Sequence, residues 1–305
     1  MIDPDLVPVF GFLLGLIAGI QSGLLGVGGG ILITPGLNII GLSMPAAVAT
    51  SLTQMVAASA AGCFRHGRAG RIYYSLMMLL GLTLGIGVFL GKSSMVYLQS
   101  LAIADTTSRW IFIVLLSVIG LFMVRKTLRQ RSQSVDHDQI LRPPFTRVWF
   151  LYSLPIVGVG ILSGLLGLGG GFFLVPTMIY LFRLDPKTAS ATSLGVIFMG
   201  AISGTVAYSS EGFTDYSLAA LCALGSVLGG YFGASCSRYV RGGWLKLMFA
   251  VSVCFGALAM LLRQLDLILA AFCVLAISAL GMTAMTLIEI YRGYSKGKAT
   301  ISEFR

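Results

Sequence analysis

Charged residues are scarce in this 305-residue chain: Asp, Glu, Lys and Arg together make up 10% of it, whereas 56% is hydrophobic. A soluble domain of this size carries roughly a quarter charged residues, because its surface needs them even around a large core. The scarcity of charge therefore excludes an ordinary soluble globular domain.

Signatures of catalytic, metal and nucleotide sites are also missing. The five cysteines are scattered in or beside apolar runs, without CxxC or Cys/His ligand spacing. No HExxH, GxSxG or GxxxxGK[ST] motif occurs. We therefore expect no catalytic residue, no metal and no cofactor. The acidic start, residues 1–5, stands where a secretory signal would be basic, which predicts no cleavable signal peptide.

Long apolar runs are what the chain has in abundance. Each is about long enough to cross a hydrocarbon core of roughly 30 Å. They lie near residues 72–92, 107–125, 187–209, 215–235, 243–262 and 266–290. Backbone groups in lipid must be satisfied within the segment, and the alternating pattern of a membrane β-barrel is absent, so the runs predict helices. The sequence thus predicts an all-α polytopic membrane protein.

An internal repeat divides the chain into two related halves. The motif SGLLGVGGG at 22–30 recurs as SGLLGLGGG at 163–171, and ATSL at 49–52 recurs at 191–194. Pro35 matches Pro176 in the same order, so chance is a poor explanation. We predict four parts, which are a first transmembrane repeat at 1–125, a cytoplasmic linker at 126–147, a second transmembrane repeat at 148–262, and a last helix with a cytoplasmic tail at 263–305.

The net charge of +10 indicates how the halves are oriented. Basic residues gather in short loops, which is typical of cytoplasmic loops and favours membrane topology over nucleic-acid binding. The loop 65–71 is strongly basic, but its counterpart 209–215 has no basic residue; the turn 43–45 is uncharged, but its counterpart 183–187 is basic. Equivalent loops should therefore lie on opposite sides, which predicts two inverted-topology repeats in the cell inner membrane with a cytoplasmic C-terminus.

The number of spans depends on the two glycine-containing stretches, 8–42 and 148–183. Each is interpreted either as two short spans that meet at the glycines or as a broken, re-entrant pair. We therefore expect roughly 8–11 transmembrane segments. Inverted topology requires an odd number of crossings in each half, which favours five.

The triple glycines Gly28–Gly30 and Gly169–Gly171 predict broken helices, since each glycine costs about 1 kcal/mol relative to alanine in a helix. New helices should start near Ile31 and Phe172, with unpaired N–H groups and the positive end of the helix dipole. Two such ends brought together by the repeat would bind an anion without a charged side chain. Close packing of helices through small residues is the alternative interpretation.

Polar side chains near the glycines complete the candidate site, because hydroxyl and amide groups can donate hydrogen bonds to an oxyanion. The candidate substrate-binding residues are Ser22, Gly28, Gly29, Gly30, Thr50, Ser51, Gln54, Ser163, Gly169, Gly170, Gly171, Thr192 and Ser193. For the serines and threonines, hydrogen bonds back to carbonyls of their own helix are an equally open alternative.

The doubled glycine motif, the prolines that follow it and the ATSL blocks resemble the TauE/SafE sulfite exporter family of membrane permeases, also called TSUP, over about residues 11–262. The resemblance implies a carrier of a small sulfur-containing anion: sulfite, a sulfonate, sulfoacetate or thiosulfate. A secondary carrier with alternating access is the interpretation we favour. A passive anion channel or uniporter, and a permease for another organic acid, remain alternatives.

The expected partners are the anion and membrane lipid, without nucleic acid. Proton or ion coupling and a homodimer are left open by the sequence. An intramembrane enzyme has no motif to support it. A purely structural subunit would have no need of helices broken at the same place in both halves.

Overall fold

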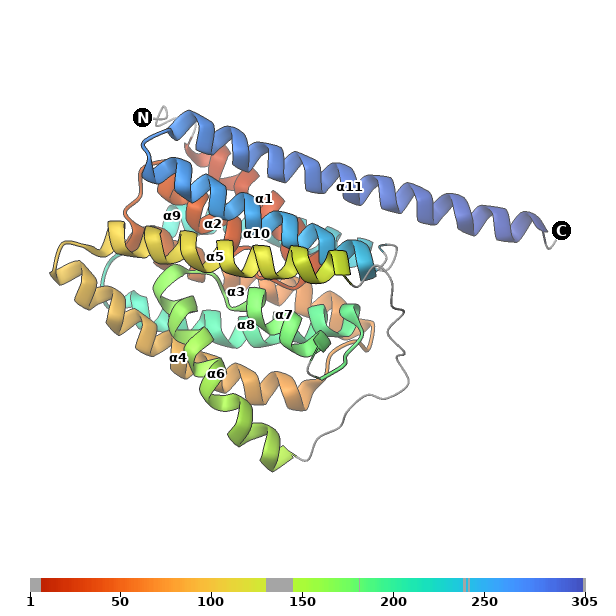
Figure 1. Ribbon diagram of the computed structural model, residues 1–305, viewed down its shortest axis with the longest axis horizontal. Helices are drawn as coiled ribbons and strands as arrows, with labels where there is room; N and C mark the ends of the chain where they lie inside the picture. The colour runs from red at the N-terminus through yellow and green to blue at the C-terminus, as the bar shows by residue number, and fades with distance from the viewer. Residues whose placement is uncertain (1–6, 130–144, 181, 238–239, 241, 304–305) are drawn as a thin grey trace.

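The chain folds into helices throughout the residues that its computed structural model describes, which are 7–129, 145–180, 182–237, 240 and 242–303 (Figure 1). The helices are α1 (Val7–Leu25), α2 (Gly30–Ile39), α3 (Met44–Arg68), α4 (Tyr74–Ser100), α5 (Ala104–Arg129), α6 (Phe145–Leu166), α7 (Gly171–Tyr180), α8 (Pro186–Ser209), α9 (Tyr216–Cys236), α10 (Gly242–Gln264) and α11 (Ile268–Glu303). The predicted all-α class is confirmed.

Eight helices in the described part of the chain are long and apolar enough to cross a membrane. They are α1, α3, α4, α5, α8, α9, α10 and α11. In contrast, α2 and α7 have only ten residues each. The glycine-containing stretches are therefore broken helices, as predicted, with a long helix before the glycines and a short one after them.

Each half supplies five helices in the same order, α1–α5 and α6–α10, and α11 follows as an additional helix. Local signals set the helix starts: Pro45 and Pro186 lie in the first turns of α3 and α8, where the missing N–H costs nothing. Helix α5 extends to Arg129 and α6 begins at Phe145, so both reach into the segment expected as linker. The rest of that segment, 130–144, lies outside the described residues.

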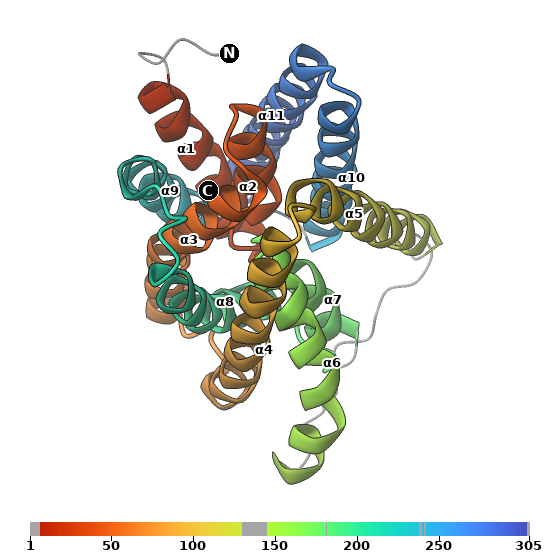
Figure 2. The same ribbon diagram turned by 90° about the vertical axis from the view of Figure 1, so that its left-hand side faces the viewer.

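The two halves interlock, because the first helix of each half packs against a helix of the other half. Helix α1 packs most extensively against α9 of the other half, and its equivalent α6 packs against α4; α3 packs against α8, and α5 against α10 (Figure 2). Glycines allow this close approach, because a methyl group placed on Gly15 would lie 2.1 Å from the carbonyl oxygen of Cys222. A methyl on Gly91 would likewise lie 2.2 Å from that of Ile161. The role of these glycines is therefore to let neighbouring helices pack closely.

The short helices lie inside the bundle. Every residue of α2 is buried, and most of the described side chains on α7 are buried as well. The fully buried Leu52 and Met55 of α3 belong to the same core as Phe172 at the start of α7. The fold thereby places the N-termini of both short helices in the interior, where the glycine motifs are.

Candidate functional site

Two glycine loops form the centre of the candidate site. The first glycine loop is residues 26–29, between α1 and α2, and the second glycine loop is residues 167–170, between α6 and α7. Equivalent glycines adopt the same left-handed backbone, with φ between +67° and +82°: Gly26, Gly28, Gly29, Gly167, Gly169 and Gly170. Residues that carry a side chain rarely adopt this backbone conformation, which explains why both motifs require glycine at these positions.

The backbone N–H groups that follow these turns lack partners. The first amides bonded after each loop are those of Leu32 and Phe173, which donate to Gly29 and Gly170. Among the described residues, the N–H groups of 27–31 and of 168–172 have no hydrogen-bond partner. Each loop with its helix N-terminus therefore offers five consecutive donors in the protein interior, at the positive end of a helix dipole.

Each glycine loop contacts the start of the short helix of the other half. A methyl group placed on Gly30 would lie 2.1 Å from the carbonyl oxygen of Gly167. In the equivalent contact, a methyl on Gly171 would lie 2.5 Å from Cα of Val27. The N-terminus of α2 thus lies against the second glycine loop and that of α7 against the first, so the donors of the two halves are brought together.

Ser22 and Ser163 are the predicted residues that lack any partner. Their side chains are 0% and 1% exposed, and neither hydroxyl forms a hydrogen bond within the described structure. Ser22 lies one helical turn after Ala18, whose methyl group would be 3.3 Å from one placed on Gly29. Residues four apart share a helix face, so Ser22 lies on the side of α1 that faces the first glycine loop.

The second half repeats this arrangement. Ser163 lies one turn after Val159, whose Cγ1 would be 3.2 Å from a methyl group on Gly170. A buried hydroxyl without a partner is uncommon and costs roughly 1–3 kcal/mol. Two such hydroxyls at equivalent positions, each beside a row of free N–H groups, are donors that a bound ligand could satisfy.

Ser51 and Ser193 hold the loops in place. Ser51 on α3 donates to the carbonyl oxygen of Gly167 at 3.2 Å, and Ser193 on α8 donates to that of Gly26 at 2.6 Å. Each hydrogen bond joins one half to the glycine loop of the other. Thr34 of α2 adds a second donor to Gly167, also at 3.2 Å.

Thr50 and Thr192 lie beside these serines but contact other helices. The Thr50 hydroxyl accepts a hydrogen bond from the Asp215 amide at the start of α9, and the Thr192 hydroxyl accepts one from the Tyr73 amide at the start of α4. Both distances are 3.1 Å. These threonines therefore fix where α9 and α4 begin, again in equivalent positions.

Gln54 breaks the symmetry, because its counterpart in the second half is Val196. Its amide nitrogen donates to Ser226 Oγ at 2.9 Å on α9, and its oxygen is buried without a partner. It therefore reaches toward α9 rather than joining the hydrogen bonds to the glycine loops.

A further pair of residues at equivalent positions lies outside the predicted set. His66 at the end of α3 lies 3.1 Å from the carbonyl oxygen of Gly23, and Tyr208 at the end of α8 donates to that of Gly164 at 2.8 Å. The two side chains occupy equivalent positions, which continuing the register of the ATSL match would have aligned. Both carbonyls belong to residues that directly follow Ser22 and Ser163, so these side chains position the ends of α1 and α6.

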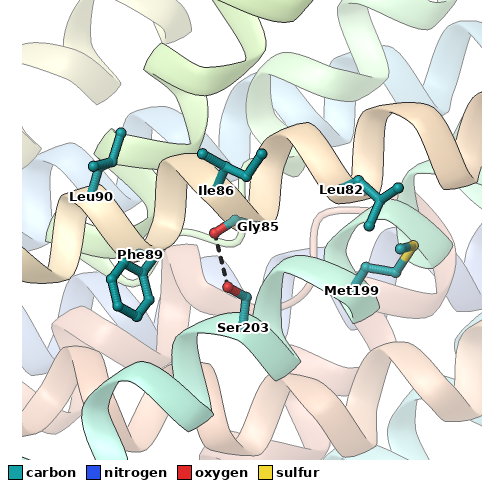
Figure 3. Close-up of a pocket in the computed structure, with 8 residues that line it drawn as sticks. Leu82, Gly85, Ile86, Phe89, Leu90, Met199 and Ser203 are labelled. Atoms are coloured by element: carbon teal, nitrogen blue, oxygen red, sulfur yellow. Dashed lines mark hydrogen bonds between the residues drawn. The ribbon is translucent and has the colours of Figure 1, made fainter.

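An apolar groove lies outside this site. It has a volume of about 420 Å³ between α4 and α8, and Ser203 bonds to Gly85 inside it at 2.8 Å (Figure 3). Its lining includes four exposed apolar side chains of α4, and none of the lining residues belongs to a glycine loop. In the part of the chain that the structure describes, no cluster of His, Cys, Asp or Glu could hold a metal.

A multi-pass helical bundle with two broken helices meeting in its interior is the architecture of a membrane transport protein. Comparison with known proteins gives the same class and a family. Residues 11–260 match the family described as "Sulfite exporter TauE/SafE", and the chain belongs to that family. The resemblance seen in the sequence is thus confirmed.

Several curated relatives carry the name of a transporter. "Probable membrane transporter protein YunE" of Bacillus subtilis is 29% identical over 248 residues, covering 75% of this chain and 88% of the relative. A "Probable membrane transporter protein" of Xylella fastidiosa is 28% identical over 221 residues, covering 72% and 80%. One from Haemophilus influenzae is 26% identical over 271 residues, covering 82% and 97%. No solved structure matches the chain.

Proposed function

We propose that this protein is a secondary carrier that exports a small sulfur-containing anion, such as sulfite or an organosulfonate, across the cell inner membrane. The observation that carries the proposal is that each glycine loop lies against the start of the other half's short helix, so that the two rows of unpaired N–H groups, 27–31 and 168–172, are brought together. The description of the family as sulfite exporters supports the choice of anion.

The binding chemistry follows from the donors. An oxyanion held between the loops would accept hydrogen bonds from the free N–H groups after Gly26 and Gly167 and from the hydroxyls of Ser22 and Ser163. The dipoles of α2 and α7 both point their positive ends at it. Ser51, Ser193, Thr50, Thr192 and Gln54 hold the surrounding helices in this account, rather than the anion itself.

The length of the short helices supports a site near the membrane midplane. Ten residues span about 15 Å, half the hydrocarbon thickness of roughly 30 Å. A methyl group on Gly36 would lie 2.5 Å from Leu14, so α2 runs back along α1 as a hairpin with the first glycine loop at its tip. Two such hairpins that enter from opposite faces would meet at their tips halfway through the membrane.

This arrangement agrees with inverted topology. A hairpin that enters and leaves on one side adds no net crossing. The first half therefore crosses an odd number of times, three with α3, α4 and α5 alone and the expected five when α1 and α2 are counted as two spans, as inverted topology requires. The basic loop between α3 and α4 then lies in the cytoplasm, the non-basic loop between α8 and α9 lies outside, and the C-terminus is cytoplasmic. Alternating access follows if the interlocked halves rock about the hairpin tips.

Counterflow in proteoliposomes tests the proposal. Vesicles preloaded with unlabelled sulfite should accumulate external ³⁵S-sulfite transiently, and the initial rate should saturate with concentration. Parallel vesicles preloaded with taurine or with chloride report which anions exchange. Flux that stays linear with concentration and shows no counterflow would contradict a carrier and indicate a channel instead.

A further inference from the structure

Met55 and Ile197 occupy equivalent positions in the two halves, one helical turn beyond Ser51 on α3 and Ser193 on α8. Both side chains are 0% exposed. Both side chains are apolar, whereas the groups around them, the serines one turn earlier and the amides of the glycine loops, are polar. The interior therefore brings a pair of hydrophobic side chains to the place where the anion donors of the two halves converge.

Each of the two side chains contacts both glycine loops. A methyl group placed on Gly169 would lie 2.7 Å from Sδ of Met55, and one on Gly28 would lie 3.4 Å from the same sulfur. The Met55 methyl group also lies against the start of α2, since a methyl on Gly30 would be 2.2 Å away. Met55 therefore lies between the two rows of donors.

Ile197 has the same contacts from the opposite helix. Its Cγ2 would lie 2.8 Å from a methyl group on Gly28 and 3.3 Å from one on Gly169. Its Cδ1 would lie 2.9 Å from a methyl group on Gly171, at the start of α7. The two residues thus form an apolar wall shared by both half-sites, which neither glycine loop could supply alone.

We propose that Met55 and Ile197 determine specificity by limiting the size of the group that the bound anion carries opposite its charged end. The inference rests on the proposed anion site. Oxygens of the anion face the amides and the serine hydroxyls, whereas the remaining substituent faces the thioether of Met55 and the branched sec-butyl group of Ile197. Oxygen atoms that face this apolar wall would lack hydrogen-bond donors. The wall therefore disfavours anions, such as sulfate, that carry oxygen atoms on every side.

The two sides of this wall differ in stiffness. Methionine has three rotatable side-chain bonds and fills irregular space, whereas isoleucine is β-branched and nearly fixed at χ1 in a helix. Met55 is therefore the side that adapts to the substituent, and Ile197 is the side that sets a fixed boundary.

A homologous series of anions with one head group tests the inference. Binding of methane-, ethane-, propane- and butanesulfonate to the purified full-length protein is measured by calorimetry for the unmodified chain, for Met55→Ala and for Ile197→Ala. We expect both variants to shift the preference toward longer chains by about 10-fold in the ratio of affinities, the discrimination typical of one methylene in an apolar pocket. Ile197→Val, which removes one methyl group and preserves packing best, should shift it less in the same direction.

Met77→Ala is the matched control, because Met77 packs on Gly195 of α8 and is not among the side chains nearest to the glycines of either loop. It should leave the chain-length profile unchanged. Variants that bind with the unmodified profile would overturn the role of Met55 and Ile197 while leaving the anion site intact. If the unmodified protein bound neither these sulfonates nor sulfite, the proposed function would fail together with the inference.

Discussion

The hydroxyl of Ser193 lies 2.6 Å from the carbonyl oxygen of Gly26, so that a side chain of the second half holds the glycine loop of the first. Its counterpart, Ser51, holds Gly167 in the reciprocal contact. Both bonds are buried, and both cross between the halves. The two glycine loops are therefore not independent turns, because each is fixed by the helix that follows the other.

This reciprocity predicts unequal losses of stability. Within the described structure Gly26 O has Ser193 as its side-chain donor, whereas Gly167 O keeps Thr34 when Ser51 is removed. We expect Ser193→Ala to lower the free energy of unfolding by about 2 kcal/mol and Ser51→Ala by about 1 kcal/mol, because a buried carbonyl without a partner is costly. Thermal unfolding in detergent measures both.

Ser93→Ala is the control for this comparison, since the exposed Ser93 bonds only to its own helix. Its unfolding temperature should match that of the unmodified chain. Equal unfolding temperatures for all three variants would contradict the assigned role of the two buried serines.

Ser22 and Ser163 predict the opposite pattern. Removing a buried hydroxyl that has no partner should leave stability unchanged or raise it slightly, so Ser22→Ala and Ser163→Ala should fold normally. Binding of sulfite should nevertheless weaken by roughly 10-fold for each, the usual value of a hydrogen bond to a charged group. Calorimetry and thermal unfolding on the same samples separate the two effects.

A loss of stability without a loss of affinity would show that these hydroxyls serve packing rather than the anion. Ser203→Ala provides a comparison, because Ser203 bonds to Gly85 in the apolar groove between α4 and α8 and its removal should not affect sulfite binding.

The ion pair of Lys92 with Glu211 gives a further prediction. It joins α4 of the first half to the loop that follows α8 of the second, and the counterpart positions, Ala69 and Ala234, carry no charge. Lys92→Met and Glu211→Gln should each destabilise the protein by about 1 kcal/mol, and the double variant should cost less than the sum. Additive losses in this double-mutant cycle would show that the pair contributes nothing.

Much of the fold could be predicted because the sequence carries it in local patterns. Apolar runs gave the long helices, and SGLLGVGGG with its repeat gave the two breaks. The sequence left open how 8–42 folds, and the ten-residue α2 decides for a long helix followed by a short one. That choice depends on where α2 packs, which is against α1 and α3 of its own half and against α10 and α11, rather than on its own residues alone.

The candidate site was predictable in its glycines and less so in its side chains. The roles of Ser51 and Thr50 could not be separated from sequence, because adjacent residues on a helix point to different neighbours. Met55 and Ile197 carry no motif and differ in type, so only their shared contacts with both loops reveal them. His66 and Tyr208 also differ in type, so their equivalence appears only when the register of the ATSL match is extended along α3 and α8.

The central claim is that the backbone of the two glycine loops binds the anion, and sulfite calorimetry on loop variants tests it most directly. The double variant Gly29→Ala with Gly170→Ala places a side chain on left-handed backbone in both donor rows. Each substitution costs about 1–2 kcal/mol of conformational free energy. Gly70→Ala with Gly212→Ala imposes the same backbone strain at equivalent loop positions where the added methyl meets nothing within 4 Å. We predict that sulfite binds the unmodified protein and the loop control alike, in preference to sulfate, thiosulfate, taurine and chloride, and at least about 10-fold more weakly to the glycine-loop variant. A folded glycine-loop variant that binds sulfite with unchanged affinity would contradict the account.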